Sequence, residues 1–110
     1  MQIILSDLYD RQAKRLIKKY PSLADEIPVA LVPLANNQLD SFDRMKQNFY
    51  KIRVPIASKG VGKRGGARIV AHVRIVNNEA HLVSIYDKAD YSDVADDVLK
   101  EFLRDNPPPQ

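Results

Sequence analysis

Cysteine and tryptophan are both missing from this chain of 110 residues. Without cysteine there can be no disulfide and no thiolate metal ligand, and such a composition suits a reducing cytoplasm. Histidine is scarce as well, because His72 and His81 alone are too few to ligate a metal, so no metal or cofactor is expected. The apolar stretch at residues 1–5 is too short for a signal peptide or a membrane span. We therefore expect a cytoplasmic protein with no membrane partner.

Glycine is also rare, and all 4 glycines lie in one basic segment, SKGVGKRGG at residues 58–66. The segment lacks the glycine order and the following helix of a nucleotide-binding P-loop. Glycines nevertheless let a backbone approach a phosphate closely, while Lys59, Lys63 and Arg64 supply positive charge. A phosphate-binding loop and a plain hairpin tip explain this segment equally well.

Acidic residues are absent from the window 51–74, although the chain contains 14 of them. Seven cations give this window a charge of +7, which leaves −4 for the rest of a chain whose net charge is +3: Lys51, Arg53, Lys59, Lys63, Arg64, Arg68 and Arg74. The acids gather near the C-terminus instead: Asp87, Asp90, Asp93, Asp96, Asp97, Glu101 and Asp105. Such segregation favours a surface that binds a polyanion, with a solvated basic loop as the alternative.

The length, with 45% hydrophobic and 28% charged residues, is typical of one globular domain over residues 1–110. A short strand is expected at residues 3–5, followed by a helix from Asp7 to about Lys19 with Ser6 as its N-cap. One face of this helix is apolar: Tyr9, Ala13, Leu16, Ile17 and Tyr20.

A second helix is expected after Ser22, which would form a capping box with Asp25. Because a proline removes a helical donor, we expect this helix to kink or break at Pro28 and to end near Pro33. Residues 35–47 are rich in turn formers and are predicted to be irregular. The two helices should pack as an antiparallel pair on a sheet.

Three further strands are predicted at residues 49–56, 68–76 and 81–86, the last two joined by a turn at Asn77-Asn78. Pro55 either ends the first of these strands or places it at an edge. Alternation in the middle strand predicts an apolar face made of Ile69, Ala71, Val73 and Ile75. If the first two strands pair, one sheet face carries four cations and no acid: Lys51, Arg53, Arg68 and Arg74. That crowding costs stability unless an anion is bound.

A last helix is expected to start at a Ser92 cap and to end at Asn106, before a disordered tail at 107–110. Its apolar stripe comprises Ala95, Val98, Leu99, Phe102 and Leu103. The acidic side of this helix is either a solvated face or a cover that folds over the basic surface. A third alternative is that it helps a binding partner to displace the helix from that surface. The order β-α-α-β-β-β-α predicts an α+β fold in which an N-terminal helical pair packs on a small antiparallel sheet, with the helices on one face.

Residues 50–88 resemble the RelE/HigB superfamily of toxin-antitoxin toxins, most closely its HigB-like branch. The resemblance rests on YKIR at 50–53, SKGVGKRGGARI at 58–69 and LVSIYDK at 82–88, in that order and spacing. The segment KYPSL at 19–23 is also similar to that family, whereas residues 35–48 are the weakest part of the match. The resemblance implies a RelE-like fold.

The resemblance also implies an activity and its partners. Toxins of this kind are microbial ribonucleases that cleave messenger RNA in the ribosomal decoding site, by metal-independent attack of a ribose 2′-OH on the adjacent phosphate. A cognate antitoxin protein wraps and neutralises the toxin. Operator DNA is bound only through the complex with that antitoxin.

Family roles can be carried over to matching positions. The resemblance implies that Lys51 and Arg53 contact the scissile phosphate and that Arg68 stabilises its charge. Three further residues near the last strand are candidates for a second basic group and for an acid or stacking group: Lys88, Tyr86 and Tyr91. RNA or ribosomal RNA contacts are expected from Lys59, Lys63, Arg64, His72 and Arg74, with an exposed strand histidine as the plainer interpretation of position 72.

Two other functions remain open. ParE-like toxins belong to the same superfamily but poison gyrase, a task that needs no phosphate clamp at Lys51, Arg53 and Arg68. A catalytically silent RNA-binding or protein-binding module would keep the basic surface and bind without cutting. Its binding would weaken steeply with salt.

Overall fold

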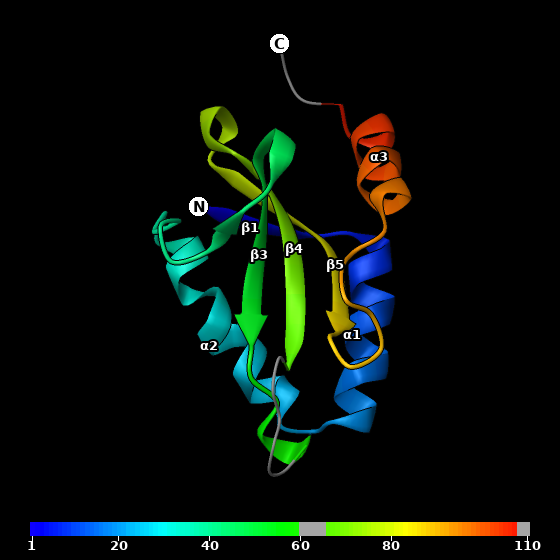
Figure 1. The fold of residues 1–110 in the computed structure, drawn as a ribbon. Helices are drawn as coiled ribbons and strands as arrows, with labels where there is room; N and C mark the ends of the chain where they lie inside the picture. The colour runs from blue at the N-terminus through cyan, green and yellow to red at the C-terminus, as the bar shows by residue number, and fades with distance from the viewer. Residues whose placement is uncertain (60–65, 108–110) are drawn as a thin grey trace.

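The computed structural model describes residues 1–59 and 66–107, without the side chain of Lys59. Figure 1 shows the order of its helices and strands, which are β1 (Gln2–Leu5), α1 (Asp7–Lys19), α2 (Leu23–Ala35), β2 (Asp43–Arg44), β3 (Phe49–Val54), β4 (Ala67–Arg74), β5 (Glu79–Asp87) and α3 (Asp96–Asp105). The predicted α+β class is confirmed, and the short strand β2 is absent from the predicted order. Within the described ranges, no helix has the length and apolar character needed to cross a membrane.

The strands form one mixed sheet in the order β1-β5-β4-β3-β2. The β2–β3, β3–β4 and β4–β5 pairs are antiparallel, as predicted, but β1 runs parallel to β5. The prediction of a wholly antiparallel sheet was therefore wrong. Because α1 and α2 separate β1 from the strands that follow, no hairpin fixes its direction, and side-chain alternation within a strand carries no information about direction.

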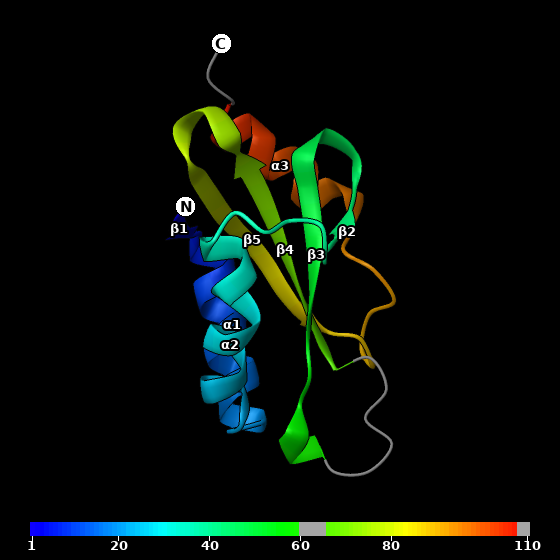
Figure 2. The same ribbon diagram turned by 90° about the vertical axis from the view of Figure 1, so that its left-hand side faces the viewer.

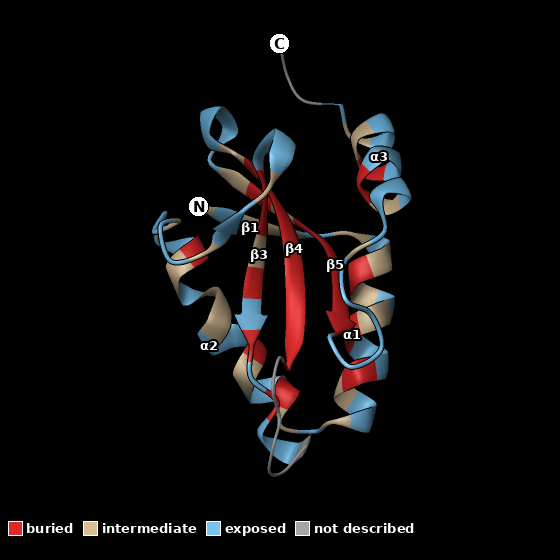
Figure 3. Cartoon of the chain, in the orientation of Figure 1, coloured by how far each residue is buried: buried red, intermediate tan, exposed pale blue. Residues whose placement is uncertain are grey.

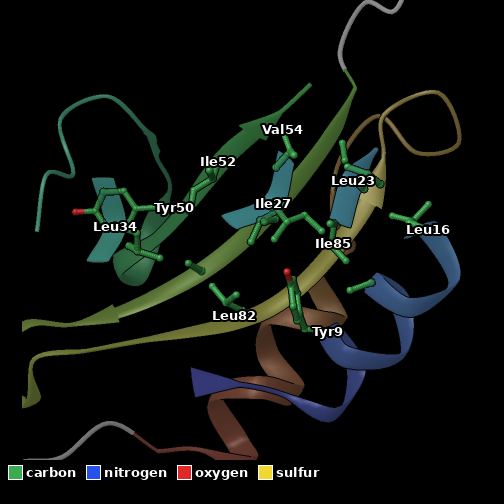
Figure 4. Packing of buried hydrophobic residues seen from close by; sticks show 14 of the residues in the cluster. Tyr9, Leu16, Leu23, Ile27, Leu34, Tyr50, Ile52, Val54, Leu82 and Ile85 are labelled. Atoms are coloured by element: carbon green, nitrogen blue, oxygen red, sulfur yellow. The ribbon is translucent and has the colours of Figure 1, made fainter. Parts of the chain in front are cut away.

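The helical pair covers one face of the sheet, as predicted (Figure 2). Close up, side chains from α1 and α2 such as Leu16, Leu23 and Ile27 meet Ile52 and Ile85 of the strands (Figure 4). Leu23 and Leu34 are fully buried, and burying a leucine side chain contributes roughly 1.5–3 kcal/mol. This cluster is the larger of the two cores.

The third helix packs against the opposite face, which corrects the prediction that all helices lie on one side (Figure 2). Leu99 and Phe102 of α3 bury against Phe49, Val70 and Val83 of the sheet. The face that carries the cations is therefore apolar over much of its area. Since such residues must be shielded from water, a cover on this side was required.

The start of α1 matches its prediction in every detail. Ser6 is the N-cap, and its Oγ accepts a hydrogen bond of 3.1 Å from the Tyr9 backbone N–H. The same hydroxyl donates to the Val83 carbonyl at 3.1 Å, which fixes the helix to β5. The cap therefore sets both the beginning of the helix and its position on the sheet.

The second helix runs without a break through Pro28 and Pro33 to Ala35, so of the predicted kink or break at Pro28 the break is absent. A proline at position 28 deprives the Ala24 carbonyl of its helical donor, and Pro33 does the same to Val29. Both Ala24 and Val29 are exposed, so water can hydrate these two carbonyls. The helix therefore tolerates both prolines on its outer side, which Figure 3 colours mainly as exposed and intermediate.

Two predicted boundaries shift near the other end of the chain. Helix α3 starts at Asp96 with Ala95 as its N-cap, not at a Ser92 cap. Strand β4 ends at Arg74, and Ile75–Asn77 forms a short 3-10 turn. Ile75 is consequently 71% exposed, in place of its predicted position on the buried face.

Candidate active site

The predicted pairing of the two basic strands is present. Arg53 of β3 lies opposite Arg68 of β4, and Lys51 lies opposite Val70 two residues along the same face. On the other side of β4, Arg68 lies opposite Tyr86 of β5. We refer to Lys51, Arg53, Arg68 and Tyr86 as the basic cluster. Residues from three adjacent strands thus bring it together at one end of the sheet.

The cations of the cluster differ in exposure. Arg53 is exposed, the Lys51 side chain is 22% exposed, and Arg68 is 7% exposed. Arg68 directs Nη1 to the carbonyl of Ala67 at 3.1 Å, which helps to orient its guanidinium. An anion approaching from solvent would therefore meet Arg53 first and Arg68 last. A guanidinium stays charged in such a position and can bind two phosphate oxygens at once.

Tyr86 is the buried, uncharged member of the basic cluster and is 6% exposed. Burial raises the pKa of its hydroxyl, the Asp93 charge adds to this effect, and the cations Lys51 and Arg68 oppose it. The phenol therefore keeps its proton at neutral pH and is able to donate it.

Asp93 joins the cluster from outside the sheet and was not among the predicted site residues. Its Oδ1 lies 2.7 Å from Lys51 Nζ and also accepts a hydrogen bond from the Val94 backbone N–H at 2.7 Å. The contact with Lys51 lowers the pKa of this carboxyl, and the Val94 N–H contributes to the same effect. The only signal for it in the sequence is the concentration of acids near the C-terminus.

The basic loop is anchored where it leaves β3. The N–H of Ala57 donates to Glu26 Oε2 at 2.8 Å, and the N–H of Ser58 donates to Ser22 Oγ at 3.0 Å. Ser22 Oγ in turn donates to Glu26 Oε1 at 2.7 Å and does not cap α2, so the predicted capping box with Asp25 was wrong. The hydroxyl is used to bind the loop to the helix instead.

The loop is anchored again where it enters β4. Gly66 has φ +50°, and a Cβ atom at this position would come within 2.4 Å of the Val54 carbonyl oxygen. Its own carbonyl accepts a hydrogen bond from Lys88 N–H at 3.0 Å. Glycine is therefore required here for both conformation and space.

The rest of the basic loop lies outside the described residues: Lys63, Arg64, the side chain of Lys59 and the other three glycines.

Two predicted residues lie at the margin of the basic cluster. Lys88 follows β5 directly and is exposed, two residues beyond Tyr86. Tyr91 is 63% exposed on the segment that leads to α3, where its N–H donates to the Asp87 carbonyl. The strand register places Tyr86 opposite Arg68, whereas Lys88 and Tyr91 follow the end of the last strand.

His72 lies on the predicted face but is only 2% exposed, so the expectation of an exposed strand histidine was wrong. Its ring packs against Phe49 and Phe102, with centroids 4.8 and 5.6 Å away. Burial lowers its pKa to about 4, and the Arg74 cation acts in the same direction. The cause is α3, whose Phe102 covers this part of the strand.

Arg74 lies apart from the basic cluster, six residues along β4 from Arg68, or about 20 Å at the usual rise per residue. Its Nε donates to His72 Nδ1 at 3.3 Å, its Nη2 donates to the Asn106 carbonyl, and its guanidinium stands over the Phe102 ring. The structure therefore connects Arg74 to the end of α3 and does not bring it together with Arg53 and Arg68.

Comparison with known proteins returns no matching family model and no matching curated protein. Across residues 1–59 and 66–107, no three His, Cys, Asp or Glu side chains come together as a set that could hold a metal ion. The basic cluster consists of three cations beside a protonated phenol. Such a set can bind a phosphodiester, stabilise negative charge that develops on it and donate a proton.

Proposed function

We propose that this protein is the toxin of a type II toxin-antitoxin module and that it cleaves messenger RNA on the ribosome. The observation that carries the proposal is the basic cluster, in which Lys51, Arg53 and Arg68 share a sheet face with the buried hydroxyl of Tyr86. The resemblance of residues 50–88 to the RelE/HigB superfamily supports the same activity. A cognate antitoxin, and operator DNA bound only through it, belong to the proposal as partners.

In the proposed reaction, the 2′-oxygen of a ribose attacks the adjacent phosphorus and the bond to the 5′-oxygen breaks. The products are a 2′,3′-cyclic phosphate and a 5′-hydroxyl end. Arg53 and Arg68 stabilise the charge that builds up on the phosphate oxygens, which is their largest contribution to rate. Tyr86 holds a proton that the leaving 5′-oxygen requires, because burial keeps its phenol protonated.

Lys51 lies beside these groups, two residues from Arg53 on the same strand face. In the proposed complex its ammonium binds a phosphate oxygen. The 2′-OH loses its proton to a basic group in the same step, and water accepts this proton when no side chain does. None of these steps requires a redox change.

The proposal is tested by messenger RNA cleavage in a translating cell-free extract. Wild type is compared with Arg53→Ala and Arg68→Ala, and Lys18→Ala is the control because it removes one exposed cation from α1, on the other side of the sheet. Loss of a group that stabilises transition-state charge should lower cleavage by about 100-fold or more. Lys18→Ala should cleave like wild type.

The chemistry of the ends gives a second readout. Downstream fragments should carry a 5′-hydroxyl and become substrates for ligation only after treatment with a polynucleotide kinase. An intact message in an extract whose translation also continues would contradict the proposal. Binding of RNA without cleavage would instead identify a silent RNA-binding module.

A further inference from the structure

An acidic segment lies between the last strand and the last helix, and it reaches the basic cluster. We name residues 88–95 the acidic strap; it contains Asp90 and Asp93 and is exposed at all but one position. The strap leaves the end of β5 and rises beside the sheet to α3, as the orange trace in Figure 2 shows. Along this path Asp93 Oδ1 comes within 2.7 Å of Lys51 Nζ.

Contacts beyond the strap hold it in this position. Asp96, the first residue of α3, pairs with Lys46 at 2.9 Å, and Phe102 of the same helix packs on Phe49 and His72. Helix α3 is thus docked on the face that carries the cations, and this docking brings the strap and Asp93 to the basic cluster. The ion pair is therefore a consequence of how α3 packs.

We propose that Asp93 is an internal competitor for phosphate, which pairs with Lys51 in the free protein and is displaced when RNA binds. This inference rests on the proposed function, in which Lys51 contacts a phosphate of the RNA. A carboxylate and a phosphodiester oxygen make the same kind of charged hydrogen bond to an ammonium group. Asp93 thus marks the position that a phosphate oxygen would take.

The pair is suited to exchange because its acidic side faces solvent. The Asp93 side chain is 57% exposed, whereas that of Lys51 is 22% exposed, so the carboxylate can rotate away without uncovering apolar surface. Ion pairs with this much exposure shift an equilibrium only a few-fold. An RNA strand binds Arg53 and Arg68 at the same time, and these contacts offset the loss of the Lys51–Asp93 ion pair.

The contact would also affect selection among ligands. A single small anion gains only one charge pair when it displaces Asp93, whereas an RNA strand brings several phosphates to the three cations. The strap therefore disfavours occupation of Lys51 by isolated phosphate or a carboxylate metabolite. It leaves the site open to a polyanion.

The first test compares Asp93→Asn with Asp97→Asn for binding of a fluorescent single-stranded RNA at low, fixed ionic strength. Asparagine can still accept the bond from Val94 N–H, so the strap keeps its turn while the charge is lost. Asp97 is an exposed acid in the first turn of α3, so its variant makes the same change in net charge. Asp93→Asn should bind about two- to five-fold more tightly than wild type, and Asp97→Asn should change affinity far less.

The second test repeats Asp93→Asn in a Lys51→Met background, with thermal unfolding to verify that each variant folds. If Asp93 acts by occupying Lys51, its replacement has no effect on affinity once Lys51 is gone. An equal gain in both backgrounds would overturn the inference, because Asp93 would then simply repel RNA. RNA binding by none of the proteins would overturn the proposed function along with it, whereas a Lys51-dependent gain without cleavage would overturn the nuclease proposal alone.

Discussion

Arg53 and Arg68 lie directly opposite each other in the β3–β4 register, on the sheet face that also carries Lys51. Like charges in such a cross-strand pair destabilise a sheet unless an anion lies between them. The proposed function gives this pair a role, because both guanidinium groups would bind the phosphate. Its effect on stability can be measured without knowledge of the ligand.

Replacing Arg53 with Gln should raise the free energy of unfolding by roughly 0.2–1 kcal/mol, because it removes one of two facing charges. Urea unfolding at low salt measures this gain. The gain should shrink as sodium chloride is added, since salt screens the repulsion in wild type. Lys18→Gln on α1 is the matched control and should change little; a loss of stability for Arg53→Gln would contradict the prediction.

Gly66 offers a test of how the basic loop is anchored. Gly66→Ala should lower the free energy of unfolding by roughly 2–4 kcal/mol, as the sum of a left-handed residue with a Cβ and an overpacked contact. The contact is the one with the Val54 carbonyl, 2.4 Å from an added Cβ. Chemical denaturation of the purified variant measures it.

Asn37→Ala is the control for the conformational part of that cost. Asn37 also has a positive φ, 60°, but it is exposed. Its alanine variant should therefore lose only about 1 kcal/mol. Equal losses in the free energy of unfolding for the two variants would show that the close approach of Gly66 to Val54 adds nothing to the cost of an alanine there.

Much of the fold follows from local patterns in the chain. The Ser6 cap and the apolar spacing of α1 each depend on neighbours within a few residues, and both predictions were confirmed. The direction of β1 and the side on which α3 packs depend on contacts between distant segments. Those two predictions were wrong because no local pattern encodes them.

The site shows the same division. The order of the strands predicts that those carrying Lys51, Arg53 and Arg68 pair, and alternation predicts that these side chains share a face. The approach of Asp93 could not, because it requires α3 to dock on the basic face first. His72 was misplaced for the same reason, since its exposure depends on Phe102 thirty residues further along the chain.

Pro28 lies inside a continuous helix, and its replacement by Ala should stabilise the protein by roughly 1–2 kcal/mol. Alanine restores the missing N–H donor, and the greater freedom of the unfolded chain offsets part of that gain. Urea unfolding checks the value. Pro21→Ala is the control because Pro21 precedes α2, so no helical bond is restored and no gain is expected. A destabilised Pro28→Ala protein would indicate that the proline is required where it stands.

His72 should make stability depend on pH below neutrality. The pKa of His72 is about 4 in the folded protein against an ordinary 6.5, mainly because the ring is buried; Arg74 and His81 add to the shift and the Gln47 backbone opposes it. Between these two values the unfolded chain binds a proton that the folded protein does not bind. The free energy of unfolding should therefore fall as the pH drops from about 6.5 to about 4, by roughly 2–3 kcal/mol from this residue.

Urea unfolding of wild type and His72→Phe across this pH range isolates that contribution. Phenylalanine keeps an aromatic ring between Phe49 and Phe102 but cannot take up a proton. Carboxylates elsewhere titrate equally in both proteins, so the difference between the two curves belongs to position 72. The curves should diverge below about pH 6.5, with wild type losing more stability, because only its unfolded state gains the imidazolium charge. Parallel curves would mean that His72 titrates alike in the folded and unfolded chain, and that α3 does not exclude water from its ring.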